Sequence, residues 1–221
     1  MSDGIFDEVL FVMAAEIEAG VHLRHRFTPT IVGVGPIEAA IGTALALQAR
    51  TASGRVTSLV VSLGSAGSRR HPVGTVCQVS HVSWRDMDAT PLGFERGVTP
   101  FANHPACVEL PTPLPGIPLA TLSTGGHVVA GEGYDAVAAD LVDMETFAVA
   151  RAAARFRVPV IGIRGVSDGP VAIRAVEDWT DALPMLDERL ANAVDLIPAA
   201  SAVLTRGSWR SPDIERGASH G

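Results

Sequence analysis

Short runs of apolar residues alternate along the chain with longer, alanine-rich segments. The short runs lack the regular polar positions of a half-exposed strand, so they are typical of strands buried on both faces of a sheet. The predicted strands are Val9–Met13, Ile31–Val34, Leu59–Leu63, Val76–Val82, Leu119–Ser123 and Val158–Ile163. The longer segments predict helices at Glu16–Phe27, Ile37–Thr51, Ala136–Phe156 and about Thr180–Leu196. This alternation predicts an α/β sandwich with a largely parallel or mixed central sheet.

Two stretches depart from this alternation. Residues 91–118 hold seven prolines and show little periodicity, which predicts loops and an edge hairpin. A long irregular stretch can serve as a lid or an oligomer contact, or it can be a plain surface excursion, and the sequence leaves both readings open. Residues 205–221 are polar and rich in glycine and serine, which predicts a flexible tail after a single domain at 1–204.

Composition and charge exclude several classes of protein. Hydrophobic residues make up 47% of the chain, enough for a substantial core. The net charge of -7 argues against a general nucleic-acid binder, which needs a positive field. Cys77 and Cys107 form no disulfide or zinc-binding pattern, so no metal site is expected. Acidic residues precede the first apolar run and no stretch is long enough to span a bilayer, so we expect a cytoplasmic protein with no membrane partner.

Small or polar residues directly follow four of the predicted strands. The carboxyl ends of parallel strands meet along one edge of a sheet, where open α/β folds bind their ligands. The four segments are Met13–Glu16, Gly64–Gly67, Ser123–Gly126 and Arg164–Gly169. Their convergence predicts a ligand site at that edge. None carries the three-glycine fingerprint of a dinucleotide site, so no nicotinamide cofactor is expected.

Glu145 is unusual by its position in the helical pattern. In a predicted helix with 3.6 residues per turn, it shares a stripe with Val142, Val149, Ala152 and Phe156. A carboxylate on an apolar stripe is costly to bury without polar partners, which a bound ligand can supply. The alternative is a glutamate at a helix N-terminus that is satisfied by free backbone N–H groups.

Four further polar residues stand at these strand ends, and the pattern alone leaves two readings for each. Asp168 is either a site acid or the cap of the next segment. Glu16 is either a site acid or a first-turn residue that complements the helix dipole, a role that Glu18 fits equally well. Arg164 either pairs with a buried carboxylate such as Glu16 or extends out of the sheet edge. His127 is either an ordinary loop histidine or a flat side chain that packs on a base.

Together these segments resemble the purine nucleoside phosphorylase/nucleosidase superfamily, and most closely its 5′-methylthioadenosine/S-adenosylhomocysteine nucleosidases. The matching motifs follow the family's order and cover most of residues 9–190; they are VMAAE (12–16), GVGPIEAA (33–40), SLGSAG (62–67), WRDMDATPLGF (84–94), VDMETFA (142–148) and VPVIGIRGVSD (158–168). The pair formed by VDMET and RGVSD is specific to the family. The resemblance implies a three-layer α/β sandwich with a mixed central β-sheet flanked by helices, over a catalytic domain at 1–204 without metal or cofactor.

The resemblance also implies roles by position. Asp168 matches the general acid that protonates purine N7 as the glycosidic bond breaks, and Ser167 matches the residue that orients it. Glu145 matches the carboxylate that holds the ribose hydroxyls. Glu16 matches the acid that orients or deprotonates the attacking water, with Arg164 supporting it. The other matched substrate-binding residues are Met144 against the sugar, Ser65, Ala66 and Gly67 near the ribose and base, and His127 and Val128 at the purine.

Glu16 is also the residue on which the prediction of hydrolysis depends. Phosphorylases of the superfamily bind phosphate with a glycine and an arginine in the loop after the first strand, where this chain has Met13–Glu16. A carboxylate at that position repels a phosphate dianion but suits a water molecule. Two alternatives stay open: a phosphate-dependent phosphorylase, for which Arg69 and Arg70 could contribute an anion site, and a non-catalytic nucleoside-binding protein.

The sequence departs from the family's pattern around the base and the 5′ end of the nucleoside. His127 stands where an aromatic residue usually stacks on adenine, and Asp143 replaces a glutamate. We therefore expect a nucleosidase that releases adenine from methylthioadenosine, S-adenosylhomocysteine or a related 5′-substituted adenosine. The family is usually dimeric, with the 5′ pocket completed by the partner chain, so we also expect a homodimer. Candidates to line that pocket are Phe94, Phe101 and Trp179.

Overall fold

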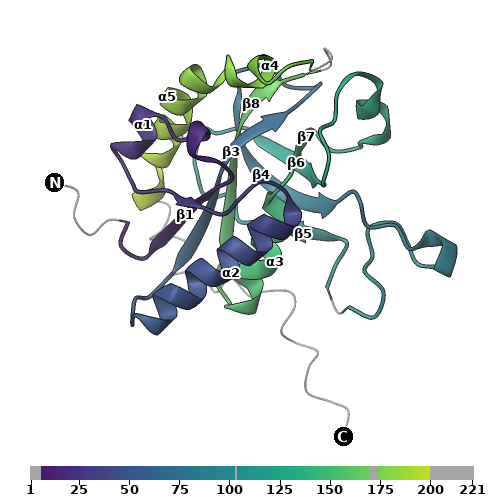
Figure 1. The fold of residues 1–221 in the computed structure, drawn as a ribbon, viewed down its shortest axis with the longest axis horizontal. Coiled ribbons are helices and arrows are strands. Elements are labelled where there is room, and N and C mark those ends of the chain that lie inside the picture. The colour runs from purple at the N-terminus through teal and green to yellow at the C-terminus, as the bar shows by residue number, and fades with distance from the viewer. Residues whose placement is uncertain (1–5, 103, 170–173, 200–221) are drawn as a thin grey trace, which may run out of the picture.

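A single mixed sheet forms the centre of the protein. The computed structural model describes residues 6–102, 104–169 and 174–199, and within them one eight-stranded sheet has helices on both faces (Figure 1). The strands are β1 (Val9–Met13), β2 (Thr30–Ile31), β3 (Leu59–Gly67), β4 (Val76–Trp84), β5 (Cys107–Glu109), β6 (Leu119–Thr124), β7 (Leu141–Asp143) and β8 (Val160–Asp168). The α-helices are α1 (Val21–Arg24), α2 (Pro36–Ala52), α3 (Thr146–Arg155), α4 (Glu177–Thr180) and α5 (Leu183–Val194). The 3₁₀ helices are η1 (Glu16–Glu18), η2 (Thr90–Leu92) and η3 (Gly131–Ala136).

The strand pairings close into a ring. β3 pairs in parallel with β8, and β8 pairs antiparallel with β4. β4 and β7 each pair in parallel with β6, and β7 returns to β3 through the antiparallel pair Gly67 and Val142. β1 and β2 extend the sheet beyond β3. The predicted α/β sandwich with a mixed central sheet is therefore confirmed.

Strand β1 shows why the predicted strands lack polar positions. All of its residues are buried, and alternate side chains point to opposite faces of the sheet. Leu10 and Val12 pack into the core on the side of α2 and α3. Val9, Phe11 and Met13 pack into the core on the side of α1 and α5. Each such side chain contributes about 1.5–3 kcal/mol on burial, so both faces of the sheet stabilise the fold.

The predicted helix Glu16–Phe27 is not continuous in the structure. The chain forms η1, breaks at Gly20 and continues as α1. The Asp187 carboxylate of α5 accepts hydrogen bonds from the backbone N–H groups of His22 and Leu23, at 2.8 and 3.1 Å. A Cβ at position 20 would lie 2.5 Å from that carboxylate, so only glycine fits there. The break therefore comes from a helix packed against it, which the local pattern does not reveal.

The predicted helix Ala136–Phe156 is also wrong in its first half. Its residues form the end of η3, strand β7 and only then α3. Leu141 pairs with Leu122 of β6, which gives this short segment a strand's hydrogen bonds. The Asp143 carboxylate accepts a hydrogen bond from the backbone N–H of Thr146 at 2.9 Å and so ends the strand and starts the helix. Glu145 is consequently the N-cap residue of α3 rather than part of a helical stripe.

The first half of the proline-rich segment extends away from the sheet, as the loops at the right of Figure 1 show, whereas Leu110 and Leu114 in its second half are buried in the core. The segment contains the edge strand β5, which pairs antiparallel with β4, so the predicted loops and an edge strand are present, but its described residues form no hairpin of their own. The predicted tail at 205–221 lies outside the described residues, and the domain limit at 204 stays a prediction. No helix in the described part of the chain is long and apolar enough to cross a membrane.

Candidate active site

A cavity of about 600 Å³ opens at the carboxyl ends of the strands. Its walls come from the segments that follow β1, β6 and β7, from the last residues of β3 and β8, and from α4. The sequence-predicted residues that line it are Ser65, Ala66, Gly67, His127, Val128, Met144, Glu145, Ser167 and Asp168. Segments far apart in the sequence therefore meet at one edge of the sheet, as parallel strands require.

Asp168 ends β8 and faces the cavity. The hydroxyl of Ser167 donates a hydrogen bond to Asp168 Oδ1 at 2.6 Å, which fixes the orientation of the carboxyl group. Burial raises the pKa of Asp168 above its usual value, against the opposing effect of the hydroxyls of Ser167 and Tyr134. A carboxyl group with a raised pKa retains its proton closer to neutral pH, which suits a general acid.

Glu145, the N-cap residue of α3, lines the cavity. Its Oε1 accepts a hydrogen bond from the backbone N–H of Gly35 at 3.0 Å, and it makes no capping bond within its own helix. Burial, followed by the neighbouring charge of Asp143, raises its pKa to about 7, while the Gly35 N–H and Arg164 oppose that rise. The free N–H that satisfies Glu145 thus belongs to the turn before α2, not to α3. Within the described residues no hydrogen bond reaches the other oxygen, Oε2, which is therefore the one offered to a ligand.

Glu16 does not reach the cavity, and this corrects its predicted role. Its side chain is 69% exposed and forms an ion pair with Arg24 on the surface. Glu18, two residues later, lines the cavity and is only 7% exposed. Its Oε1 accepts hydrogen bonds from the backbone N–H of Ser65 at 2.9 Å and from the Ser65 hydroxyl at 2.7 Å.

The cause of this error is the geometry of η1. A continuous α-helix would place Glu16 on the same face as Ala19, Leu23 and Phe27, which are all buried. The 3₁₀ turn and the break at Gly20 rotate the start of this segment, so that Glu18 points inward instead. A glycine inside an otherwise regular helical pattern was the available signal for that break.

Arg164 has a partner, but not the predicted one. It is 2% exposed and donates to Asp143 Oδ2 at 2.9 Å, to Ser62 Oγ at 2.9 Å and to Thr146 Oγ1 at 2.6 Å. The reading that it pairs with a buried carboxylate is therefore confirmed, with Asp143 in place of Glu16. Because Asp143 and Thr146 flank Glu145 in sequence, this buried network fixes the backbone that carries Glu145.

A second, much smaller pocket lies beside the main cavity. It has room for about 10 Å³ and is lined by Glu18, Glu145, Arg164 and Ser65, among others. That volume is close to the space that one water molecule needs. Two carboxylates and a guanidinium therefore surround a space of the size of one water.

The loop after β6 forms the opposite, more open side of the cavity. Arg85 donates to the carbonyls of Ser123 at 2.6 Å and His127 at 2.5 Å, and so holds the loop against the end of β4. The side chain of His127 is 66% exposed, with Nδ1 3.6 Å from Asp86 Oδ1. Val128 is 62% exposed. This side consists of loop residues that face both solvent and cavity.

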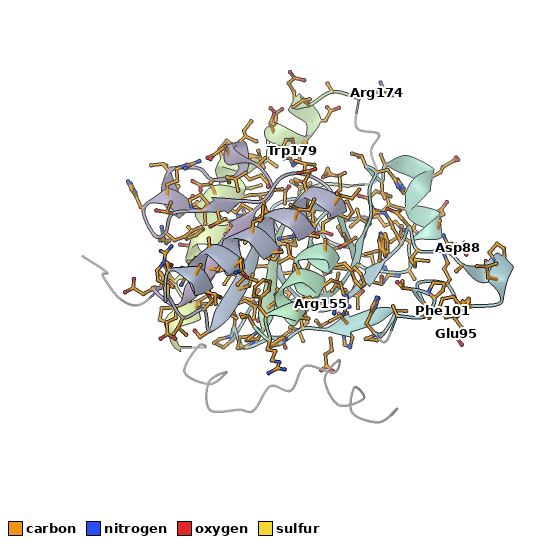
Figure 2. All side chains as sticks on the ribbon, turned by 60° about the horizontal axis from the view of Figure 1, so that its bottom comes forward. Asp88, Glu95, Phe101, Arg155, Arg174 and Trp179 are labelled. Carbon is orange, nitrogen blue, oxygen red and sulfur yellow. The ribbon has the colours of Figure 1, made fainter. Side chains whose placement is uncertain are left out.

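Only one of the three aromatic candidates for the 5′ pocket lines the cavity. Trp179 lines the cavity. Phe101 is 99% exposed and packs edge-on against Phe94, with ring centroids 5.8 Å apart. Figure 2 shows Phe101 on the projection beside Asp88, far from Trp179, so the protomer does not bring the two phenylalanines to this cavity by itself.

Arg69 and Arg70, the candidates for an anion site, form ion pairs with aspartates outside the cavity lining. Arg69 forms an ion pair with Asp135, and Arg70 pairs with Asp140 at 2.5 Å. Neither lines the cavity. The same cavity includes Arg174 and Arg85, which the sequence did not single out. Within the described residues, no group of three His, Cys, Asp or Glu side chains is arranged to hold a metal ion.

Known proteins resemble this chain in both sequence and fold. A family model described as Phosphorylase superfamily matches residues 127–205. A futalosine hydrolase of Streptomyces coelicolor is 34% identical over 198 residues, covering 80% of this chain and 79% of the relative. A 5′-methylthioadenosine/S-adenosylhomocysteine nucleosidase of Staphylococcus carnosus is 28% identical over 162 residues, covering 63% of this chain and 67% of the relative.

The fold comparison agrees. The crystal structure of a putative 5′-methylthioadenosine/S-adenosylhomocysteine nucleosidase from Francisella philomiragia has a TM-score of 0.73 at 15% identity, covering 86% of this chain and 98% of that one. At that identity the likeness supports the fold, while the Streptomyces relative supplies the sequence relationship over most of both chains. The chain therefore belongs to the nucleoside phosphorylase/nucleosidase superfamily, among its hydrolytic purine nucleosidases.

Proposed function

We propose that this protein hydrolyses the N-glycosidic bond of a 5′-substituted adenosine, with 5′-methylthioadenosine and S-adenosylhomocysteine as first candidates, and releases adenine. The observation that carries the proposal is the buried Glu18 carboxylate at the base of the cavity, in a chain whose Asp168 faces the same cavity. One acid is available to the leaving base and another to the attacking water, and Glu145 lines the same cavity.

Asp168 acts on the base. As the bond between C1′ and N9 breaks, its electron pair leaves with the purine, and a proton from Asp168 to N7 neutralises the charge that develops there. Ser167 holds the carboxyl group in place through its 2.6 Å hydrogen bond. Burial raises the pKa of Asp168, which favours the protonated form that a general acid requires.

Glu145 acts on the sugar. Bond breaking leaves the ribose with oxocarbenium character, which a nearby carboxylate stabilises. The oxygen that does not bind Gly35 accepts hydrogen bonds from the ribose hydroxyls, while Met144 lines the same wall. Glu145 must be ionised for this role, so its raised pKa makes substrate binding sensitive to pH near neutrality.

Glu18 acts on the water, in the role that the family resemblance implies for Glu16. The water oxygen attacks C1′, and one of its protons passes to Glu18. The small pocket between Glu18, Glu145 and Arg164 supports this assignment, because it has the size of one water. A phosphate dianion would meet two carboxylates there, and this disfavours phosphorolysis.

Futalosine is a second candidate substrate. It is the substrate named for the Streptomyces coelicolor relative, whose match is the longest of those described above. The loop with His127 and Val128 supports keeping both candidates, since it departs from the nucleosidase pattern on the open side of the cavity.

We also propose that the protein works as a homodimer in the cytoplasm. On α2, Ile37, Ile41 and Leu45 are 73%, 51% and 65% exposed and form one stripe, since they are four residues apart. Val34, which is 56% exposed, continues the stripe to the wall of the cavity. A second copy of the chain over this stripe would cover it and the cavity wall at Val34. The location in the cytoplasm rests on sequence composition alone.

A substrate panel tests the reaction. The purified protein is incubated with methylthioadenosine, S-adenosylhomocysteine, futalosine and inosine, each with and without inorganic phosphate, and free base is quantified by chromatography. We expect base release that does not depend on phosphate, together with a free sugar product. Release that requires phosphate and yields a sugar 1-phosphate would establish a phosphorylase. Binding of every nucleoside without base release would establish a non-catalytic protein.

A further inference from the structure

Helix α4 places one side chain against the catalytic machinery from outside the sheet. Trp179 is half-buried, lines the cavity, and donates a hydrogen bond from its indole Nε1 to the hydroxyl oxygen of Ser65 at 2.9 Å. Figure 2 shows Trp179 on this side of the molecule, below Arg174. Ser65 in turn contacts Glu18, so a tryptophan far along the chain reaches the water-binding acid through one intermediate residue.

The direction of these hydrogen bonds follows from the chemistry of the three groups. An indole N–H can only donate, a carboxylate can only accept, and a serine hydroxyl has one hydrogen and can also accept. Ser65 must therefore accept from Trp179 and donate to Glu18. With its lone pair held by the indole, the hydroxyl hydrogen is directed to Glu18 Oε1, 2.7 Å away.

Both hydrogen bonds from Ser65 reach the same oxygen of Glu18. The backbone N–H and the hydroxyl of Ser65 lie 2.9 and 2.7 Å from Oε1. Within the described part of the chain, Oε2 accepts no hydrogen bond from a protein group, and the small pocket adjoins this carboxylate. The Glu18 carboxylate packs over Gly64, where a Cβ would lie 3.1 Å from Oε1, so the group is also confined from below.

We propose that Trp179 is a positioning residue for hydrolysis: its indole N–H orients the Ser65 hydroxyl, which holds one oxygen of Glu18 and leaves the other for the attacking water. This inference rests on the proposed function, because it assigns the water to Glu18. It gives α4 a role in the chemical step as well as in closing the cavity. The competing role for Trp179 is an apolar wall that contacts substrate and nothing more.

A double-mutant cycle separates these two roles. Trp179→Phe keeps an aromatic wall and removes the N–H, so we expect kcat to fall roughly fivefold, as for one lost hydrogen bond, with KM within about twofold. In a Ser65→Ala background the same substitution should change kcat no further, because the intermediate hydroxyl is already absent. Equal losses in both backgrounds, or a change confined to KM, would overturn the proposal in favour of the wall.

Trp84→Phe is the matched control. The Trp84 indole nitrogen is buried with no hydrogen-bond partner among the described residues, and its ring stacks on Phe147, 6.1 Å between centroids. It does not line the cavity. Removing this N–H should leave kcat unchanged, and a loss equal to that of Trp179→Phe would show that any tryptophan substitution slows the enzyme.

A measurement without substrate keeps the inference distinct from the proposed function. The indole N–H signal of Trp179, assigned by its loss in Trp179→Phe, is followed by ¹⁵N–¹H NMR. It should move in Ser65→Ala and also in Glu18→Gln, but not in Glu16→Gln, which alters only the surface acid. If the chemical shift of the Trp179 indole N–H were the same in Glu18→Gln as in the wild type, the connection from Trp179 to Glu18 would be refuted even in an active enzyme. Conversely, if the wild type released no base from any nucleoside, the proposed function would be wrong. The NMR shifts would still show whether Trp179 is coupled to Glu18 through Ser65.

Discussion

One side of the cavity is formed by strand residues and the other by loop residues. On the strand side, Ser65, Ser167 and Asp168 belong to β3 and β8, and their polar groups are bonded to one another or to Glu18. On the loop side, His127 and Val128 belong to no strand, and each is more than half exposed. Rigid strands suit groups that must be held within tenths of an ångström of a reacting atom, while loops tolerate change. We infer that the strand side sets the reaction and the loop side sets the preference among nucleosides.

The largest effect should come from the strand side, at Asp168. Asp168→Asn keeps the shape and removes the proton donor, so kcat should fall roughly a thousandfold while nucleoside binding is retained. Steady-state kinetics with a purine nucleoside and calorimetric binding measure the two quantities. Ser167→Ala, which removes only the orienting hydroxyl, should have a much smaller effect. Full activity in Asp168→Asn would show that the acid is another group.

The next largest effect distinguishes two glutamates only two residues apart. Glu18→Gln removes the group assigned to the water and should lower kcat roughly a hundredfold. Glu16→Gln loses only an exposed ion pair with Arg24. We therefore expect kcat to stay within about twofold of wild type and the free energy of unfolding to be nearly unchanged. Both variants are measured by base release in the same assay. A larger loss in Glu16→Gln than in Glu18→Gln would restore the role that the family resemblance implies for Glu16.

Glu145 should make binding depend on pH. Its pKa of about 7 leaves roughly a tenth of the group ionised at pH 6, so KM should rise about tenfold between pH 8 and pH 6. Initial rates across this range, analysed separately for kcat and KM, measure the effect. A KM that is constant with pH would mean that Glu145 does not bind substrate as a carboxylate.

The same group should lower stability as pH rises. Its pKa is raised from 4.5 to about 7 in the folded state, so the folded protein holds the proton more tightly than the unfolded chain between these values. The free energy of unfolding therefore falls as pH rises through this window. Glu145→Gln should raise it at pH 8 by about 1–3 kcal/mol while impairing catalysis. Urea denaturation at pH 5 and pH 8 measures the difference, which should be small at pH 5.

The smallest effect should come from the loop side. His127→Phe restores an aromatic residue of the kind that the nucleosidase pattern carries, and kcat should stay within about threefold because no reacting proton passes through this side chain. The ratio of kcat/KM between methylthioadenosine and futalosine should change more than kcat does. If kcat itself fell as far as in Glu18→Gln, the division between a chemical side and a selective side would not hold.

The parts of this protein that sequence predicts well are those where burial is decided by the strand itself. Val9–Met13 coincides with β1 because every residue is buried on one face or the other. The family motifs also lead to Asp168, Glu145 and Ser65, all of which line the cavity. Asp168 could not be singled out by pattern, since an aspartate before glycine is ordinary turn chemistry.

The parts that sequence predicts poorly depend on contacts from elsewhere in the chain. The family resemblance assigns the water-activating role to Glu16 through the motif VMAAE, but the buried acid is Glu18. The Asp187 carboxylate of α5 caps α1 after Gly20, and the local pattern does not reveal this contact. The sequence marks Trp179 only as a candidate to line the pocket, because nothing local reveals that its indole N–H bonds to Ser65, 114 positions earlier in the chain. Such contacts join segments that periodicity treats one at a time.

One pairing in the ring of strands is much shorter than the pairing of β3 with β8, and it lies at the cavity. β7 meets β3 only at Gly67 and Val142, whereas β3 and β8 remain paired from Val60 to Gly67. Local opening begins where the fewest backbone hydrogen bonds hold, so amide hydrogens at this pairing should exchange earlier than those of β3 near Val60. A bound nucleoside would contact Gly67 on one strand and Met144 just beyond the other. The ligand would thus bridge the two strands at this short pairing, and occupancy of the site would slow local opening of the sheet there.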